Sequence, residues 1–195
     1  YLGYAARAMT VSQILRIALF FALSAWLVSV SRASLKQPRS HGFWRFFAWE
    51  CILGLFLVNL PRWFEDPFSP RQLIAWFLLI VSAFLVLHAV YILRRHGRAG
   101  EQREGEALIG FEKTTRLVTQ GAYGLIRHPM YSSLLCMAWG IFCKDPSLAA
   151  GVLAAAATGF LVATARADEA ECLRFFGPAY LDYKQSTKMF IPYVF

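Results

Sequence analysis

Long apolar runs alternate with short polar segments along this chain. Runs of spanning length occupy residues 11–30, 43–60 and 72–93. Each is close to the roughly 20 residues that an α-helix needs to cross about 30 Å of hydrocarbon, so the pattern predicts three membrane-spanning helices. The first run lacks a short apolar core followed by a small-residue cleavage site, and we therefore expect a retained span rather than a signal peptide.

Two further apolar runs follow a polar segment in the second half of the chain. Residues 132–143 form a short run, residues 148–165 form a longer one, and a Lys-Asp-Pro turn at residues 144–146 separates them. This pattern predicts a helical hairpin whose first helix is continuous with residues 129–131. The second helix is expected to continue past the membrane to a Gly-Pro pair at residues 177–178, a typical helix stop.

Small residues recur along the second helix of the hairpin. Gly151, Ala155 and Gly159 follow one another at four-residue spacing. Small residues at this spacing let a neighbouring backbone approach closely in lipid. We therefore expect these three positions to lie at the packing face of the hairpin.

Composition supports a membrane protein. The chain of 195 residues is 57% hydrophobic and only 16% charged, and its mean hydropathy is +0.45, which excludes an ordinary soluble domain. The prediction is one all-α integral membrane domain with about five transmembrane helices. Residues 1–93 would form the three N-terminal spans, and residues 94–195 would form a polar loop, the hairpin and a C-terminal tail.

The distribution of basic residues predicts how the spans are oriented. With five crossings, and with Arg16 and Arg45 left out because they lie within span ends, one face of the membrane receives fourteen Lys and Arg residues and the other face receives four. Cytoplasmic segments accumulate Lys and Arg. The bias predicts an N-terminus outside, a cytoplasmic C-terminus, and polar segments around residues 117–131 and 168–169 on the same cytoplasmic face.

No disulfide framework or metal site is predicted. Three of the four cysteines lie within apolar runs and no CxxC motif occurs, which favours buried or reduced thiols over disulfides. His88 and His96 could share a helix face, but no third ligand is spaced to join them. The arginine cluster within residues 94–103 is expected to bind lipid headgroups and to set the topology rather than to bind nucleic acid.

The first candidate for chemistry is the polar segment at residues 117–131. Gly121 permits a close approach of the backbone to a ligand, and Tyr123 and Tyr131 offer flat faces and hydroxyls. Pro129 forces His128 out of the helical region at the entrance to a span. This corner suits a planar polar ligand, although an interfacial belt of aromatic and basic anchors would have the same composition.

The second candidate is the acidic pair Asp168-Glu169, which the hairpin topology puts on the same face as the first. The helix that carries it is expected to lift both carboxylates into the headgroup region. Alternatively, Arg166 and Glu169 are three residues apart and could simply pair with each other.

Four segments together carry a resemblance to a known family. They are Leu117-Val118-Thr119-Gln120-Gly121-Ala122-Tyr123, Arg127-His128-Pro129-Met130-Tyr131, Asp168-Glu169, and Phe175-Phe176-Gly177-Pro178-Ala179-Tyr180-Leu181-Asp182-Tyr183. In order and spacing they resemble the isoprenylcysteine carboxyl methyltransferase and phospholipid methyltransferase superfamily of integral membrane methyltransferases. The resemblance covers about the last 80 residues, and the first three runs match only as generic hydrophobic helices.

This resemblance implies a function and a set of site residues. It implies an S-adenosylmethionine-dependent methyltransferase of the endoplasmic reticulum or a bacterial inner membrane, with a cytoplasmic cofactor pocket and a lipid-borne or amphiphilic substrate. It implies catalytic roles for Arg127, His128 and Glu169, and Arg166 is the nearest cation for binding the substrate. No metal is required. The cofactor residues that it implies are Thr115, Arg116, Leu117, Val118, Gly121, Tyr123, His128, Pro129, Met130, Tyr131, Asp168 and Glu169.

One position departs from the family and leaves the methyl acceptor open. In prenylcysteine enzymes an Arg associated with the substrate carboxylate lies five residues before the second acidic position, where this chain has Thr164. Arg166 lies about 200° around the helix from that position. Asp168 also stands where the family often has a glutamate. Three kinds of methyl acceptor therefore stay open. A carboxylate needs mainly a cation to orient it, whereas an amine must first lose a proton to a base such as His128 or Glu169. The third kind is a small thiol.

Two other classes of function stay open at this point. Membrane reductases that resemble sterol reductases are similar to this superfamily at the C-terminal hairpin, and a non-catalytic scaffold could use the same fold. The cofactor that binds separates the three: S-adenosylmethionine for a methyltransferase, a nicotinamide for a reductase and neither for a scaffold.

Overall fold

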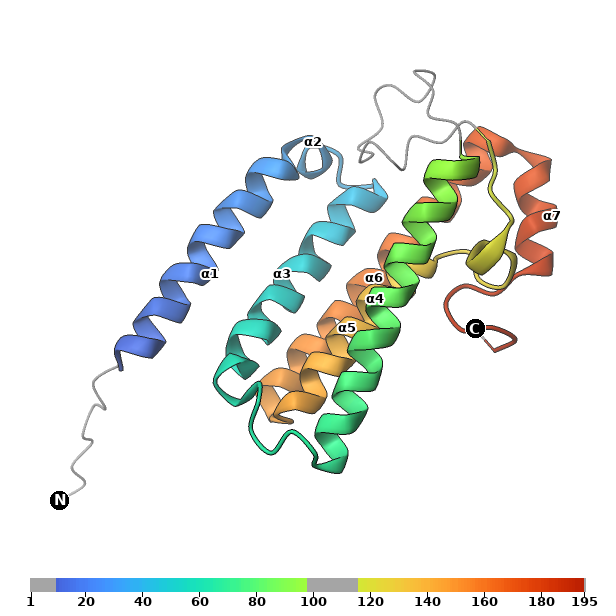
Figure 1. Ribbon diagram of the computed structural model, residues 1–195. Helices are drawn as coiled ribbons and strands as arrows, with labels where there is room; N and C mark the ends of the chain where they lie inside the picture. The colour runs from blue at the N-terminus through green and yellow to red at the C-terminus, as the bar shows by residue number, and fades with distance from the viewer. Residues whose placement is uncertain (1–9, 98–115, 195) are drawn as a thin grey trace.

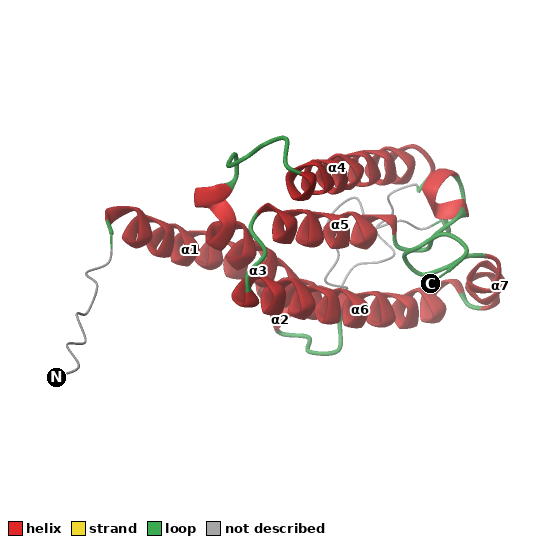
Figure 2. Ribbon diagram, turned by 90° about the horizontal axis from the view of Figure 1, so that it is seen from below, coloured by secondary structure: helices red, strands yellow, loops and turns green. Residues whose placement is uncertain are grey.

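The regular elements in the described part of the chain are all helical (Figure 1). The computed structural model describes residues 10–97 and 116–194. Its helices are α1 (Val11–Val30), α2 (Arg32–Leu35), α3 (His41–Asn59), η1 (Leu60–Arg62), α4 (Pro70–His96), η3 (Gly121–Gly124), α5 (Pro129–Lys144), α6 (Leu148–Phe176) and α7 (Pro178–Ser186). Helices α1, α3, α4, α5 and α6 lie roughly side by side, and α7 lies across one end of the bundle (Figures 1 and 2).

Local sequence sets where the helices begin and end. Ser40 and Ser147 cap α3 and α6, and their hydroxyls accept hydrogen bonds from the backbone N–H of the third residue of each helix. Pro70 and Pro129 occupy the first turns of α4 and α5, where a missing N–H costs nothing. Gly177 ends α6 with a φ of 60°, a conformation that favours glycine. The predicted stop at residues 177–178 is therefore confirmed.

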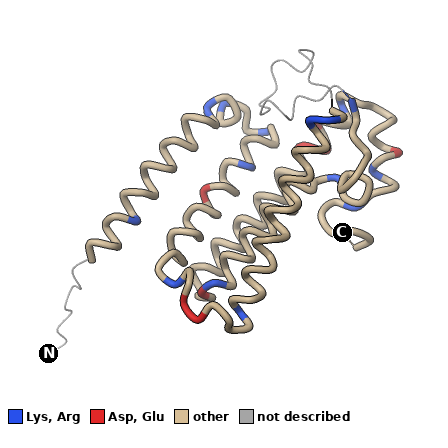
Figure 3. Tube along the Cα trace, viewed as in Figure 1, with Lys and Arg blue, Asp and Glu red and all other residues tan. Residues whose placement is uncertain are grey.

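Most of the charged residues lie toward the two ends of the bundle (Figure 3). The end that carries α2 and α7 is mainly basic. The opposite end has fewer basic residues, and acidic partners accompany them: Arg62 and Arg71 both lie within 4 Å of Asp145, at 3.2 and 3.6 Å. The two ends of the molecule therefore differ clearly in charge.

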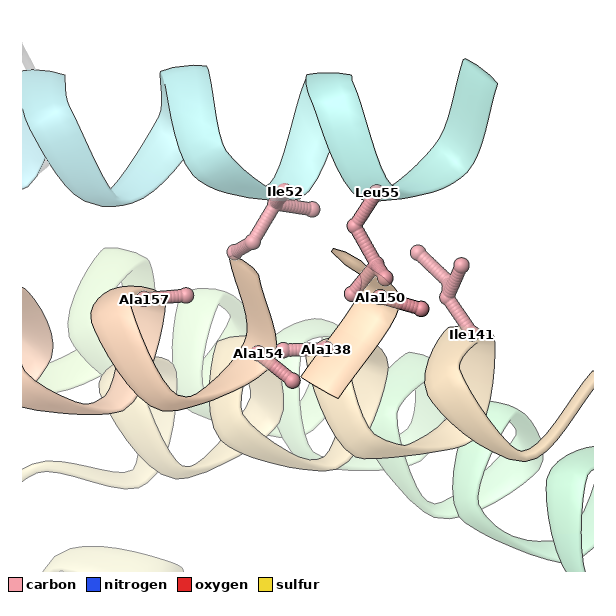
Figure 4. Packing of buried hydrophobic residues seen from close by; sticks show 7 residues of the cluster. All are labelled: Ile52, Leu55, Ala138, Ile141, Ala150, Ala154 and Ala157. Atoms are coloured by element: carbon pink, nitrogen blue, oxygen red, sulfur yellow. The ribbon is translucent and has the colours of Figure 1, made fainter. Parts of the chain in front are cut away.

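The core is built from small side chains that let the helices approach closely. α4 packs mainly on α5, and α3 packs mainly on α6. Ile52 and Leu55 of α3 point toward the alanines of α6 (Figure 4). Between α4 and α5, the close approach occurs at Gly140, where an added Cβ would lie 3.1 Å from Leu79 Cγ.

The prediction of which small residues of α6 form the packing face was wrong. Ala155 and Gly159 are exposed, and an added Cβ at Gly159 would contact nothing within 4 Å. The fully buried positions are instead Ala150, Ala154 and Ala157. Ala150 and Ala154 lie about 100° around the helix from Gly151 and Ala155. α3 therefore packs on the alanine face, whereas Ala155 and Gly159 face outward. Gly151 is half-buried beside α5, where an added Cβ would lie 3.6 Å from Phe142 Cε2.

Within residues 10–97 and 116–194, four helical stretches are long and apolar enough to cross a membrane: Val11–Val30, His41–Arg62, Pro70–His96 and Leu148–Phe176. Their high content of exposed apolar side chains, as on α1 and α4, fits a multi-pass integral membrane protein. The predicted spans of the first half are thus found as α1, α3 and α4, each within a few residues of its expected limits.

α5 is shorter than its neighbours and packs between α4 and α6. Its 16 residues span about 24 Å at 1.5 Å per residue. At its far end, Asn59 Nδ2 donates to the Ile141 carbonyl at 2.7 Å, and Lys144 Nζ donates to Gln72 Oε1 at 2.8 Å. Lys144 is fully buried, and its ammonium lies 3.2 Å from the centre of the Trp76 ring, so a cation–π contact stabilises it.

Candidate active site

A cavity of about 110 Å³ lies at the end of the bundle where α3 begins and α4 and α6 end. α7 and the segment before α5 complete its wall. Side chains from every one of these elements line it: His41, Leu93, Arg116, Leu117, Val118, Tyr123, Arg127, His128, Met130, Tyr131, Asp168, Cys172, Phe176, Tyr180 and Tyr183. The cavity thus joins parts of the chain that lie far apart in sequence.

The turn η3 presents Tyr123 to this cavity. It begins at Gly121, which has a φ of 60°, and an added Cβ there would lie 2.7 Å from His88 Nε2. The His88 ring also accepts a hydrogen bond from the backbone N–H of Ala122 at 3.3 Å. Gly121 therefore allows a close approach, but to α4 rather than to the cavity.

His128 lies at the N-cap of α5, next to the cavity. Its φ of −124° and ψ of 58° are outside the helical region, and Pro129 opens the helix, as the sequence predicts. The imidazole stacks on the Tyr131 ring at a centroid distance of 5.3 Å and an angle of 17°. The backbone N–H of His128 donates to the Met189 carbonyl at 3.2 Å, so the C-terminal tail holds this corner in place.

Asp168 extends from α6 toward His128 and Tyr131. The Tyr131 hydroxyl donates to Asp168 Oδ2 at 3.2 Å, and His128 Nδ1 lies 3.5 Å from the same oxygen. The Cys172 thiol, one turn later on α6, lies 3.6 Å from Oδ1. The Asp168 side chain is 23% exposed and lines the cavity, so its charge is available to a ligand there.

Glu169 takes a different place, because successive residues point about 100° apart on a helix. Its carboxylate accepts a hydrogen bond from Arg127 Nε at 2.7 Å and pairs with Lys184 Nζ at 2.6 Å. Glu169 and Arg127 side chains are 7% and 8% exposed. This cluster, in which Lys184 is half-exposed, joins α6, α7 and the segment before α5, and Glu169 is not among the cavity-lining residues.

The pKa of His128 is raised above its ordinary value of 6.5. Burial is the largest single influence and lowers it, but the nearby charges of Asp168 and Glu169 together outweigh burial. His128 Nε2 lies 3.5 Å from Glu169 Oε1 without a hydrogen bond of good geometry, so we attribute the effect to charge. Burial also raises the pKa of the Tyr180 and Tyr183 hydroxyls, which stay neutral.

α7 closes the cavity and is fixed by its own polar contacts. The Tyr183 hydroxyl donates to the Tyr123 carbonyl at 2.7 Å. Arg127 Nη1 donates to the carbonyls of Lys184 and Thr187. Beyond α7, the chain forms a parallel bridge between Ile126 and Lys188. Arg127 is therefore bonded to both α6 and the end of α7.

The structure brings most of the residues expected at the cofactor together. Arg127 and the following expected cofactor residues line the cavity: Arg116, Leu117, Val118, Tyr123, His128, Met130, Tyr131 and Asp168. Gly121, Pro129, Glu169 and Arg166 are not among the lining residues, and Arg166 is exposed. Thr115 lies outside the described residues.

Several lining residues had no assigned role in the sequence. Phe176, Tyr180 and Tyr183 belong to the aromatic motif at residues 175–183, which signalled the family but not a position. No sequence pattern pointed to a functional role for His41, which directly follows the helix cap Ser40. Its Nδ1 lies 2.6 Å from Glu171 Oε2, a contact between residues 130 positions apart.

Together the fold and this site define a multi-pass membrane protein with a polar and aromatic pocket at one end of its helical bundle. Most of the residues that line this pocket lie within the region that matches a known family. Residues 70–177, more than half of the chain, match the phospholipid methyltransferase family, so the chain belongs to that family. The match begins at α4 and ends at the glycine after α6, and the resemblance to integral membrane methyltransferases is confirmed.

A curated relative belongs to the same superfamily of integral membrane methyltransferases. Methanethiol S-methyltransferase 1 from Bradyrhizobium diazoefficiens is 29% identical over 137 residues, which cover 66% of this chain and 44% of that protein. The chain thus spans less than half the length of this relative. No solved structure matches the chain.

Proposed function

We propose that this chain is an S-adenosylmethionine-dependent membrane methyltransferase that acts on a lipid-borne or amphiphilic acceptor. The observation that carries the proposal is the convergence of one carboxylate, two arginines and four tyrosines on a single cavity, within and just beyond the segment that matches the methyltransferase family. A buried pocket with a few convergent polar groups is the usual form of a small-molecule site.

The chemistry of the lining residues fits this cofactor. Asp168 is an acceptor for its ammonium group, and Arg116 is a donor for its carboxylate. The rings of Tyr123 and Tyr131 provide flat apolar faces for the adenine, and aromatic faces also attract a sulfonium cation. Arg127 is engaged by Glu169 and two carbonyls, so we assign to it the positioning of the α5 corner.

When bound, S-adenosylmethionine supplies a methyl group that is activated by its positive sulfur. The protein then has to hold a nucleophile in line with that methyl group and to exclude water, and such positioning accounts for much of the rate. His128 and Tyr131 would orient the Asp168 carboxylate by their contacts with Oδ2. Glu169 would fix α7 over the cavity through Lys184.

The orientation of the molecule follows from its charge. The basic end, which carries the cavity, would face the cytoplasm of a bacterium or of a cell with an endoplasmic reticulum. α5 would be a fifth crossing, short but running through the core beside α4. A site at the ends of spans is reachable sideways from the bilayer, which suits a lipid-borne acceptor.

A thiol is a second candidate acceptor, and a specific observation favours it. The relative from Bradyrhizobium diazoefficiens is named for the S-methylation of methanethiol. The family name, in contrast, favours the amine headgroup of a phospholipid. Both acceptors differ from a carboxylate in carrying a proton at neutral pH.

Titration of the purified protein in nanodiscs tests the proposal. We expect S-adenosylmethionine to bind and a nicotinamide cofactor not to bind, and His128→Ala to weaken binding while the protein stays monodisperse. Methyl transfer is then measured with a labelled methyl group against phospholipids and thiols. Binding of a nicotinamide alone would indicate a reductase, and binding of neither cofactor would indicate a scaffold; either result would overturn the proposed function.

A further inference from the structure

A second histidine–carboxylate pair borders the cavity and has no role in the function proposed above. His41 is the first residue of α3, is 1% exposed and lines the cavity. Its partner Glu171, on α6, is 6% exposed. A buried ionisable pair beside a ligand cavity is a candidate for proton transfer, because burial and a charged partner tune such groups.

The two residues are joined by two hydrogen bonds. His41 Nδ1 lies 2.6 Å from Glu171 Oε2, and the backbone N–H of His41 donates to Glu171 Oε1 at 2.8 Å. A carboxylate only accepts hydrogen bonds, so Nδ1 carries the hydrogen. The other ring nitrogen, Nε2, lies on the ring edge away from Glu171. The N-terminus of α3 also stabilises the negative charge of Glu171.

We propose that His41, oriented by Glu171, is the general base that removes the proton from the methyl acceptor. This inference rests on the proposed methyltransferase function. The S–H or N–H bond of the acceptor breaks and its proton moves to His41 Nε2, while the acceptor's electron pair bonds to the methyl group. The bond between methyl and sulfonium breaks, and its electrons remain on sulfur as a neutral thioether. Glu171 balances the imidazolium that forms.

The proposal narrows the class of acceptor. A carboxylate is ionised at neutral pH and needs no base, whereas a thiol with a pKa of about 8.5 or an ammonium group with a higher pKa does. The His41–Glu171 pair, called the dyad below, therefore points to an acceptor that carries a proton before the reaction. Thiols provide the sharper test, because their acidity can be varied over a wide range.

The same residues could be considered as metal ligands, but the geometry favours the dyad. One ligand atom each of His41, Asp168 and Glu171 lies within 4.8 Å of the others. Both oxygens of Glu171, however, already accept hydrogen bonds from His41. A cation at this place would have to displace them, so metal dependence becomes an outcome of the test.

Several other titratable groups face His41 across the cavity and enter its pH dependence. They are Asp168 and Cys172 of α6, His128 before α5, Arg116 and Arg127, and the tyrosines at positions 123, 131, 180 and 183. A change in the pH profile is therefore assigned to His41 only when it is lost in a His41 variant.

Two variants distinguish a role of His41 as the general base from a purely structural role of its contact with Glu171. His41→Gln removes the base. Glu171→Gln keeps an oxygen for the backbone N–H of His41, but its amide group turns a donor toward Nδ1 and leaves Nε2 protonated. With a thiol of pKa of about 9 or higher, of which only about 1% is ionised at pH 7, we expect both variants to lower kcat by about 100-fold or more at that pH. Binding of S-adenosylmethionine should change little, and His96→Gln, outside the cavity, should behave as the wild type.

A series of thiols of different acidity supplies the decisive measurement. In the wild type, kcat should depend weakly on thiol pKa, whereas in both variants it should fall steeply for the less acidic thiols. Acidic thiols, already ionised, should be methylated almost as fast by the variants. Raising the pH should rescue the variants with the other thiols, because hydroxide then replaces the base.

Four results would overturn this assignment. An equal loss for all thiols would indicate a structural role, and an unchanged kcat would show that another group takes the proton. Loss of wild-type activity on chelation, with recovery on adding Zn²⁺, would indicate a metal site. If His41→Gln fails to fold, Glu171→Gln and the wild-type thiol series still decide. Wild-type protein that binds no S-adenosylmethionine would refute the proposed function itself and the base with it.

Discussion

Replacing Asp168 with Asn removes one negative charge from the cavity while it preserves the size of the side chain. Asparagine can still accept the hydrogen bond that Tyr131 donates to Asp168 at 3.2 Å. The fold around this position should therefore persist. What is lost is the charge that the proposed cofactor's ammonium group would meet.

The size of the effect follows from the position of Asp168. Its side chain is 23% exposed, so the carboxylate is partly dehydrated and a hydrogen bond to it from an ammonium group is worth about 1.5–3 kcal/mol. This corresponds to a loss of roughly 10- to 150-fold in affinity for S-adenosylmethionine. A fully solvated surface carboxylate would contribute almost nothing.

Glu169→Gln is the matched comparison, one residue further along α6. Glu169 is paired with Arg127 and Lys184 at 2.7 and 2.6 Å and does not line the cavity. We expect this variant to lower the free energy of unfolding by about 1–3 kcal/mol, since a buried charged hydrogen bond is weakened. Its affinity for the cofactor should stay within about threefold of the wild type.

Calorimetric titration and thermal unfolding of both variants in nanodiscs measure the two effects separately. The reasoning would be refuted if Asp168→Asn left the affinity unchanged. It would also be refuted if Glu169→Gln weakened binding as strongly as Asp168→Asn without lowering stability, because Glu169 would then be the cofactor ligand.

Two further predictions concern the elements that hold the cavity. Gly121→Ala should destabilise the protein by about 1–3 kcal/mol, because a non-glycine residue at positive φ is strained and its Cβ would lie 2.7 Å from His88 Nε2. Gly159→Ala, with nothing within 4 Å of an added Cβ, is the control and should be neutral or slightly stabilising; equal thermal unfolding of the two variants would contradict the reasoning. The second prediction concerns pH. Because the pKa of His128 is raised above 6.5 in the folded state, its charge stabilises the fold fully below pH 6.5, and this contribution is lost as the pH rises through the raised value. Unfolding measured from pH 6 to about pH 9 should show this loss in the wild type but not in His128→Gln, and identical slopes would exclude it.

Much of the secondary structure was determined by the sequence alone, because its signals are local. The apolar runs that predict spans became α1, α3, α4 and α6, and the start of α5 at Pro129 and the end of α6 at Gly177 were also predicted. Helix periodicity, caps, proline and glycine act within a few residues of one another. The family motifs similarly identified most of the cavity lining.

Which helix faces meet was decided only by the tertiary structure. The glycine stripe of α6 indicated a packing face, yet the alanine face around Ala154 is the buried one. Gly121 was expected to approach a ligand, but its close neighbour is His88. Both outcomes depend on the rotation and separation of whole helices, which local sequence patterns do not specify.

The different surroundings of the adjacent carboxylates Asp168 and Glu169 were also decided only by the tertiary structure. From the sequence, both Asp168 and Glu169 were candidates for contact with the cofactor, and Glu169 was also expected to be catalytic. In the fold, Asp168 faces the cavity and Glu169 is buried among cations from α7 and the segment before α5, since neighbouring helix positions point about 100° apart. The contact between His41 and Glu171 joins residues 130 positions apart, and only the packing of α3 against α6 brings such distant residues within hydrogen-bonding distance.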